Sequence, residues 1–266
     1  MIWPEIPPGV SPAAYYVLVG LAVLVIGLSK AGFGGGIGIL AMPLTAAAMP
    51  GQPQRMLGIL LPILILADIL SNLHYLKAWE PRLLKPLLLG AAAGIVAGSV
   101  GVWYFQRSSP AAFKRGLSLL IGGICLVFVA IQLPGLWGRP ARSLPPGRGS
   151  SLAVGGVAGF VSTMSHGAGP IVTLYLLQEK LEKRILVGTL VFFFLVVNVA
   201  KVPTYAAMGW INGATLRDGL WTLPLLPLGT LAGAWLMKRM PEKPFIVVLY
   251  AATAFTAAHM IWSAVR

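Results

Sequence analysis

Long apolar stretches that carry almost no charge dominate this chain of 266 residues. They span roughly 11–54, 56–76, 86–106, 116–138, 149–178, 185–216, 219–237 and 244–265. Most of them reach the ~20 residues that a helix needs to cross a bilayer. Only 10% of the residues are charged and the mean hydropathy is +0.83, which excludes a soluble globular fold. The sequence therefore predicts an all-α polytopic membrane protein with about eight membrane units.

The chain contains an internal repeat, visible when the sequence is shifted by 130 positions. Gly58, Asp68, Ser71 and Tyr75 then fall on Gly188, Asn198, Lys201 and Tyr205. Further along, Gly94 and Gly98 match Gly229 and Gly233 as pairs of small residues that allow helices to pack closely. We therefore predict a first transmembrane repeat over 1–133, a cytoplasmic linker over 134–150 and a second transmembrane repeat over 151–266.

The first unit of each repeat is too long for one simple crossing. Residues 13–49 would form a helix of about 55 Å, although the hydrocarbon core is only ~30 Å thick. Glycines cluster at 32–36, and the corresponding stretch at 162–170 is rich in small polar residues. Each unit is either one helix with a long overhang or two short helices that meet at membrane depth, as in a re-entrant hairpin.

The positions of the loop cations favour the re-entrant alternative. If both first units are re-entrant, twelve cations share one side of the membrane: Lys77, Arg82, Lys85, Arg139, Arg142, Arg148, Lys180, Lys183, Arg184, Lys238, Arg239 and Lys243. Six remain on the other side, whereas eight full crossings would divide the cations ten to eight. The uneven division obeys the positive-inside rule. It leaves three transmembrane helices in each repeat, so the two repeats are inverted and both termini are periplasmic.

Few ionisable side chains lie at membrane depth. Lys30 is the only charged residue between positions 6 and 54. Asp68, Ser71, Asn72 and Tyr75 share one helical face, and Asn198, Lys201 and Tyr205 share the equivalent face of the second repeat. Asp68 is either a structural partner of a lysine or a proton-coupling carboxylate. Two buried lysines against one aspartate leave an excess of positive charge, which favours an anionic ligand.

The predicted helix breaks add further groups that suit an oxyanion. Helix starts at such breaks present free N–H groups, and glycine lets the backbone approach a ligand. The hydroxyls of Ser29, Ser162, Thr163 and Ser165 are neutral donors. His166 stands between Ser165 and Gly167 at the second break, where we expect it to face a cavity.

Signatures of other chemistries are missing from the sequence. It contains no Walker lysine motif, no His/Glu cluster with metal-ligand spacing, no CxxC and no GxSxG turn. We therefore expect no cofactor, no metal site and no catalytic residue. The net charge of +13 comes from short loops between apolar segments, which is typical of the positive-inside rule and of contacts with anionic lipid rather than with nucleic acid.

Four blocks of the sequence resemble the TauE/SafE family of sulfite and organosulfonate exporters. They are GLSKAGFGGGIGILAMPL, MLGILLPILILADILSNLHYLKAWE, GGVAGFVSTMSHGAGPIVTLYLL and VGTLVFFFLVVNVAKVPTY. The resemblance covers essentially the whole chain. It implies a proton-driven secondary transporter in the bacterial inner membrane for a small sulfur-containing anion such as sulfite, sulfoacetate or thiosulfate. It places anion-facing positions at Ser29, Lys30, Gly34, Gly35, Gly36, Ser165, His166, Gly167, Asn198 and Lys201.

Two other functions fit the same residues. An anion channel would use the same positive lining, and a membrane-embedded enzyme would use His166 and Asp68 as acid and base. The titratable groups lie near the middles of the apolar segments rather than at headgroup level, which favours transport over an enzyme. The expected partners are a small anionic substrate, protons, membrane lipid and a second copy of the chain in a homodimer.

Overall fold

The computed structural model describes residues 4–35, 38, 41–108 and 147–241, and isolated positions in 109–146 and 242–266. All regular structure in these residues is helical. The predicted units at 116–138 and 244–265 and the predicted linker at 134–150 lie largely outside the described residues, as does Gly36.

The described helices follow the predicted units closely. They are α1 (Pro12–Phe33), α2 (Ala41–Ala48), α3 (Pro53–His74), α4 (Pro81–Ser108), α6 (Arg148–Ser165), α7 (Gly169–Gln178), α8 (Lys183–Ala207), α9 (Gly213–Leu220) and α10 (Leu225–Arg239). Within the described residues, α1, α3, α4 and α8 are long and apolar enough to cross a membrane. Helices α9 and α10, bent by 61°, would together make a fifth span. The chain is therefore an all-α multi-pass membrane protein.

Local sequence signals fix several helix starts. Helix α1 begins at Pro12 because Ser11 Oγ accepts a hydrogen bond from Ala14 N at 3.2 Å and proline suits the first helical position. Asn212 caps α9 in the same way by accepting from Ala214 N and Thr215 N. These caps satisfy backbone N–H groups that have no partner within the helix.

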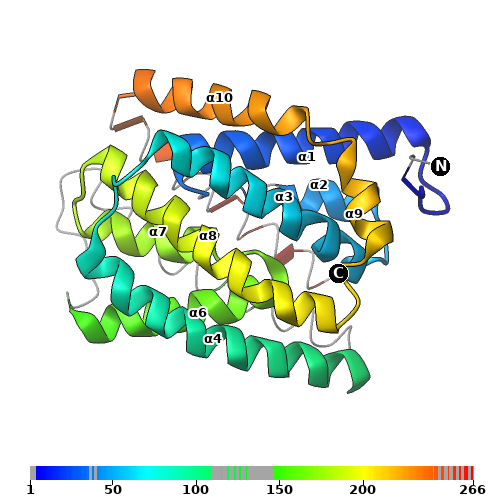
Figure 1. Cartoon of the computed structure of the whole chain (residues 1–266), viewed down its shortest axis with the longest axis horizontal. Coiled ribbons are helices and arrows are strands. Elements are labelled where there is room, and N and C mark those ends of the chain that lie inside the picture. The colour runs from blue at the N-terminus through cyan, green and yellow to red at the C-terminus, as the bar shows by residue number, and fades with distance from the viewer. Residues whose placement is uncertain are drawn as a thin grey trace.

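The helices of the two halves are interleaved. We call α1–α4 the first half and α6–α10 the second half. Helix α1 packs along α10 and α4 along α6, while α3 and α8 lie between these two pairs (Figure 1). A Cβ atom at Gly94 would lie 2.0 Å from Gly156 O, and one at Gly233 would lie 2.3 Å from Leu28 O. The close helix approach predicted for the paired glycines is therefore confirmed at these positions.

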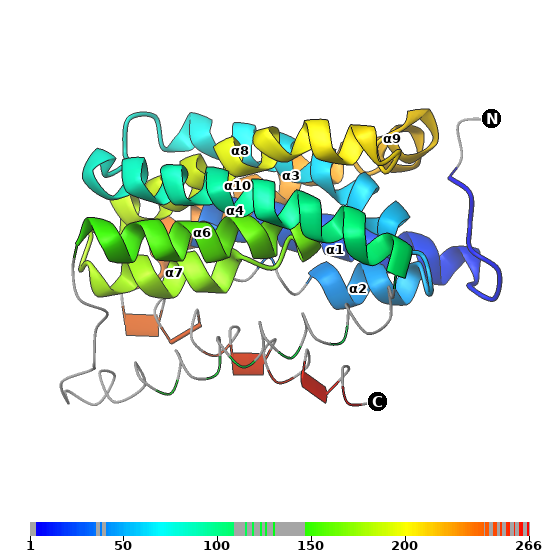
Figure 2. The ribbon, with the colours of Figure 1, turned by 90° about the horizontal axis from the view of Figure 1, so that it is seen from below.

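Helices α3 and α8 run antiparallel. Gly58, near the start of α3, packs so closely on Trp210, beyond the end of α8, that a Cβ would lie 1.9 Å from Trp210 O. Gly188, near the start of α8, meets Ala78, beyond the end of α3, with a corresponding distance of 1.8 Å. The short helices α2 and α7 lie on one side of the bundle (Figure 2).

Polar contacts join the halves at both ends of α3 and α8. Arg55, in the first turn of α3, forms a 2.7 Å ion pair with the buried carboxylate of Asp218 in α9. Beyond the other end of α3, Glu80 N donates to Thr189 Oγ1 of α8 at 2.9 Å. Contacts between the halves are therefore present at both ends of α3 and α8.

Candidate functional site

Both predicted helix breaks are present. Helix α1 ends at Phe33, where Gly34 and Gly35 adopt positive φ angles of 61° and 95°, and α2 begins at Ala41. Helix α6 ends at Ser165, where His166 adopts φ 55°, and α7 begins at Gly169. Positive φ is costly for residues other than glycine, so His166 is held in an unusual backbone conformation by its surroundings.

A tyrosine stabilises each break in the same way. Tyr75 OH donates to Ala31 O, and Tyr205 OH donates to Thr163 O at 2.9 Å. Each carbonyl lies three residues before the residue that ends its helix in the left-handed conformation. Carbonyls in the last turn of a helix lack a partner within the helix, so the two hydroxyls satisfy equivalent groups in the two halves.

The first charged cluster is built around Asp68, which is fully buried in α3. Lys30 Nζ lies 2.7 Å from Asp68 Oδ1, and Asn198 Nδ2 donates to Asp68 Oδ2 at 2.7 Å. Lys30 Nζ also lies 4.5 Å from the centroid of the Phe194 ring. The carboxylate is thus shared between the ammonium of α1 and the amide of α8.

The second cluster surrounds Lys201, which is fully buried in α8. Its ammonium donates to Ser162 O at 3.1 Å, to Ser162 Oγ at 2.9 Å and to His166 Nδ1 at 3.0 Å. His166 Nε2 in turn donates to Leu57 O of α3 at 3.2 Å. One neutral tautomer of His166 satisfies both contacts, and the chain of hydrogen bonds links the second half to the first.

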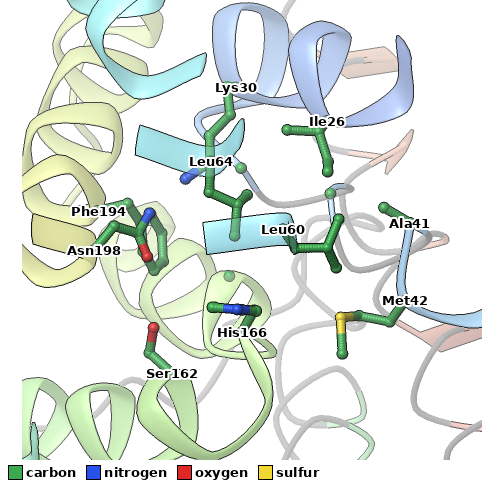
Figure 3. A pocket seen from close by; sticks show the side chains of 13 residues that line it. Ile26, Lys30, Ala41, Met42, Leu60, Leu64, Ser162, His166, Phe194 and Asn198 are labelled. Carbon is green, nitrogen blue, oxygen red and sulfur yellow. The ribbon is translucent and has the colours of Figure 1, made fainter. Parts of the chain in front are cut away.

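A small cavity lies where the two breaks meet α3 and α8. It is lined by Ile26, Lys30, Gly35, Gly38, Ala41, Met42, Leu60, Leu64, Ser162, His166, Gly169, Phe194 and Asn198. Ile26, Ala41, Met42 and Leu60 lie on the opposite side of it from Ser162, Phe194 and Asn198 (Figure 3). The cavity leaves about 30 Å³ for the centres of water-sized molecules. On that measure one water needs roughly 10–15 Å³, so this conformation holds only a very small solute.

The cavity is electropositive. Helix α2 begins at Ala41 and α7 at Gly169, and both residues line it, so the positive ends of two helix dipoles meet there. Lys30 adds an ammonium group, which Asp68 balances from outside the cavity, and the described lining residues include no carboxylate. This combination favours an anion in the space.

Five of the predicted substrate-binding residues line this cavity: Lys30, Gly35, Ser162, His166 and Asn198. Asp68 and Lys201 do not line it but contact residues that do. Ser29, Gly34, Thr163, Ser165 and Gly167 lie at the breaks without lining the cavity. Among these, Thr163 Oγ1 and Ser165 Oγ donate to carbonyls one turn earlier in α6. The structure therefore brings both breaks and both lysine clusters together around one space.

Sequence reasoning missed several lining residues, above all Phe194. Helical spacing could have identified Phe194 as a lining residue, because it precedes Asn198 by four residues on the face that carries Lys201. The shift of 130 positions also matches Phe194 with Leu64, which lines the cavity from α3. Gly169 lies within the predicted second break, whereas Gly38 carries no such signal, since single glycines are common in membrane helices.

The fold and the site together define a helical membrane protein with a buried, positively charged cavity between its two halves. The model of the family described as "Sulfite exporter TauE/SafE" matches residues 19–260, so the chain belongs to this family. Comparison with curated proteins and with solved structures finds no match. Among the described residues, no group of three or more His, Cys, Asp or Glu side chains is placed to hold a metal ion.

Proposed function

We propose that the protein is a secondary transporter that carries a small sulfur-containing anion, of the sulfite, sulfoacetate or thiosulfate class, through the cavity between its halves. The observation that carries the proposal is the cavity lining, in which Lys30 and the starts of α2 and α7 all present positive charge. Membership of the sulfite exporter family supports the nature of the substrate.

The charges around the cavity support an anionic cargo. Lys30 and Lys201 carry two positive charges, whereas Asp68 supplies one negative charge to the same buried region. A buried charge is stable only when it is paired or when a ligand compensates it. A bound anion would supply the missing compensation.

Lys30 is the group that links the anion to protons. Its ammonium contacts Asp68 and lines the cavity, so it can turn from the carboxylate to an arriving anion. Asp68 would then keep only the amide of Asn198 and would take up a proton. We therefore assign proton coupling to Asp68, with release of the anion reversing both steps.

The same contacts favour a carrier over an anion channel. Arg55–Asp218 and Gly58–Trp210 join the halves at one end of their interface, and Glu80–Thr189 and Gly188–Ala78 join them at the other. A channel needs an open path past both groups of contacts at once, whereas a carrier can break them in turn. The membrane-embedded enzyme remains the second alternative, and it requires that His166 and Asp68 turn over a substrate.

The antiparallel course of α3 and α8 supports two inverted repeats, over 1–133 and 151–266, in which α1–α2 and α6–α7 are the interrupted units. Inverted repeats with a site at broken helices are the usual architecture of carriers that expose one site alternately to the two sides. We place the chain in the inner membrane with both termini in the periplasm and the 134–150 linker in the cytoplasm.

Flux measurements in proteoliposomes test this function. The purified protein is assayed with sulfite, thiosulfate, sulfoacetate, taurine and sulfate, with and without an imposed proton gradient. We expect saturable flux of at least one sulfur anion that the gradient accelerates. Linear, gradient-independent flux would indicate a channel, and chemical conversion of a substrate would indicate an enzyme.

The variant Lys30→Ala tests whether this flux depends on the cavity. Lys85→Ala is the matched control, because Lys85 is exposed. Because Lys30→Ala leaves the Asp68 charge buried without its cation, the double variant Lys30→Ala/Asp68→Asn is assayed as well. We expect both to lose high-affinity binding while Lys85→Ala keeps it. Normal binding in the folded double variant would refute the proposed site.

A further inference from the structure

The ring of Phe194 is the least expected part of the cavity wall. Phe194 belongs to α8 and is almost fully buried, and its centroid lies 4.5 Å from Lys30 Nζ. A Cβ at Gly35 would lie 3.6 Å from Lys30 Nζ and 3.6 Å from Phe194 Cδ2, so the first helix break packs over both side chains. The ring therefore meets the ammonium inside the interface between the halves.

The face of an aromatic ring attracts a cation without offering a hydrogen-bond acceptor. Lys30 consequently has two partners of different kinds, because the Asp68 carboxylate forms an ion pair with its ammonium and the Phe194 ring attracts the same charge. A second acceptor in place of the ring would compete with an anion for the ammonium protons. The ring leaves those protons available.

The repeat indicates that the ring serves the lysine in particular. Leu64 of α3 occupies the position equivalent to Phe194 and also lines the cavity, but its side chain is aliphatic. The aromatic residue of this equivalent pair thus lies on α8, 4.5 Å from Lys30 Nζ, whereas α3 meets Lys30 through Asp68. If this position only had to fill apolar space, leucine would serve in both halves.

We propose that Phe194 is a positioning residue whose ring holds the Lys30 ammonium at the cavity while it moves between Asp68 and the anion. This role rests on the proposed function, because it requires that Lys30 binds the transported anion. Without the ring, Asp68 alone would hold the ammonium, and the affinity of the site for the anion would be lower.

A series of fluorinated phenylalanines at position 194 separates this role from simple packing. Fluorine changes the size of the ring little but progressively removes the negative potential of its face. We measure sulfite binding to the purified full-length protein by calorimetry, together with its thermal unfolding. We expect affinity to fall stepwise with each added fluorine, by roughly 2- to 30-fold in total, with little change in unfolding temperature.

Two companion variants complete the test. Phe193, the neighbouring buried ring of α8, receives the same series, and we expect its fluorination to leave sulfite affinity unchanged. Phe194→Leu, which copies the residue of the other half, should bind sulfite as weakly as the most fluorinated protein, and Phe194→Tyr should bind nearly as well as the parent. Equal affinity across the fluorinated series would overturn the inference.

The failure of this inference can be told from failure of the proposed function. If Lys30→Ala/Asp68→Asn abolishes sulfite binding while the fluorinated series has no effect, the anion site stands and only the role of Phe194 is wrong. If the parent protein binds none of sulfite, thiosulfate and sulfoacetate, or if the double variant binds normally the anion that the parent binds, both proposals are wrong.

Discussion

The buried lysine of each half stands at a position where the other half has a serine. Lys30 and Ser162 each lie four residues before the left-handed residue of a helix break. Ser71 and Lys201 each lie four residues before the tyrosine whose hydroxyl donates to a carbonyl at a break. Each half thus has one lysine and one serine, but in opposite places. Both ammonium groups still reach the region between the halves.

The partners of the two lysines differ in kind. Lys30 contacts a carboxylate and an aromatic ring and lines the cavity, whereas within the described part of the chain Lys201 bonds to neutral acceptors on Ser162 and His166. Lys30 can therefore exchange one anionic partner for another. Lys201 instead donates hydrogen bonds to Ser162 and His166, which line the cavity. If the proposed function is right, the first half would exchange the ligand and the second half would orient the site.

Asp68→Asn should have the largest effect, because it removes the group that competes with the anion for Lys30. We expect this variant to bind substrate and to exchange it downhill, but to lose accumulation against a gradient when a proton gradient is imposed. The measurement is uptake into proteoliposomes under both conditions. Undiminished accumulation would make Asp68 a structural partner of Lys30 and leave His166 as the next candidate for coupling.

Lys30→Ala and Lys201→Ala test the division of roles directly. A charge-assisted hydrogen bond contributes about 1.5–3 kcal/mol, so each loss should weaken binding by roughly 10- to 100-fold. We expect Lys30→Ala to lie near the upper end of this range and Lys201→Ala near the lower end, because Lys201 does not line the cavity. Calorimetry on folded protein measures both, and unchanged affinity in both would make the lysines purely structural.

Gly34→Ala tests the backbone at the first break. Gly34 has φ 61° and an added Cβ would lie 2.6 Å from Leu190 Cβ, so strain and overpacking should together cost about 2–4 kcal/mol. Gly209→Ala is the control, since Gly209 has φ 70° but no atom within 4 Å of an added Cβ. Thermal unfolding should show a clearly larger loss for Gly34→Ala, and equal losses would mean that Leu190 moves aside freely.

Tyr75→Phe and Tyr205→Phe should have the smallest effects. Each removes one hydroxyl from an equivalent carbonyl at a helix break, so each should lower stability by about 1 kcal/mol. Thermal unfolding of the two variants should give nearly equal shifts. Unequal shifts would mean that the two breaks are stabilised differently despite their matching geometry.

Much of this arrangement could be predicted from the sequence. Apolar segment lengths predicted the helices, excess length with clustered small residues predicted both breaks, and the shift of 130 positions matched Asp68 with Asn198, which are in contact. Helical periodicity also predicted correctly that Asp68, Ser71, Asn198 and Lys201 are buried. These features depend on local sequence patterns, which can be recognised without knowledge of tertiary packing.

The pairing of the buried groups could not be predicted. Lys30 was a candidate partner of Asp68 on the same grounds as Lys201, and only the placement of α1 against α3 decides between them. The contact of His166 with Leu57 O depends on a left-handed backbone at a residue that is not glycine. Such details follow from how helices meet across the interface, which a single sequence does not encode in any local pattern.

The most direct test of the anion site uses selenite, which has the charge and shape of sulfite but contains an atom that scatters X-rays anomalously. Crystals of the protein are soaked in selenite, and the anomalous signal locates selenium. We predict a peak in the cavity between Lys30, Ser162 and the start of α7 at Gly169, and its loss when excess sulfite is added. Selenium found only at exposed loop cations, with the cavity empty at saturating selenite, would contradict the account.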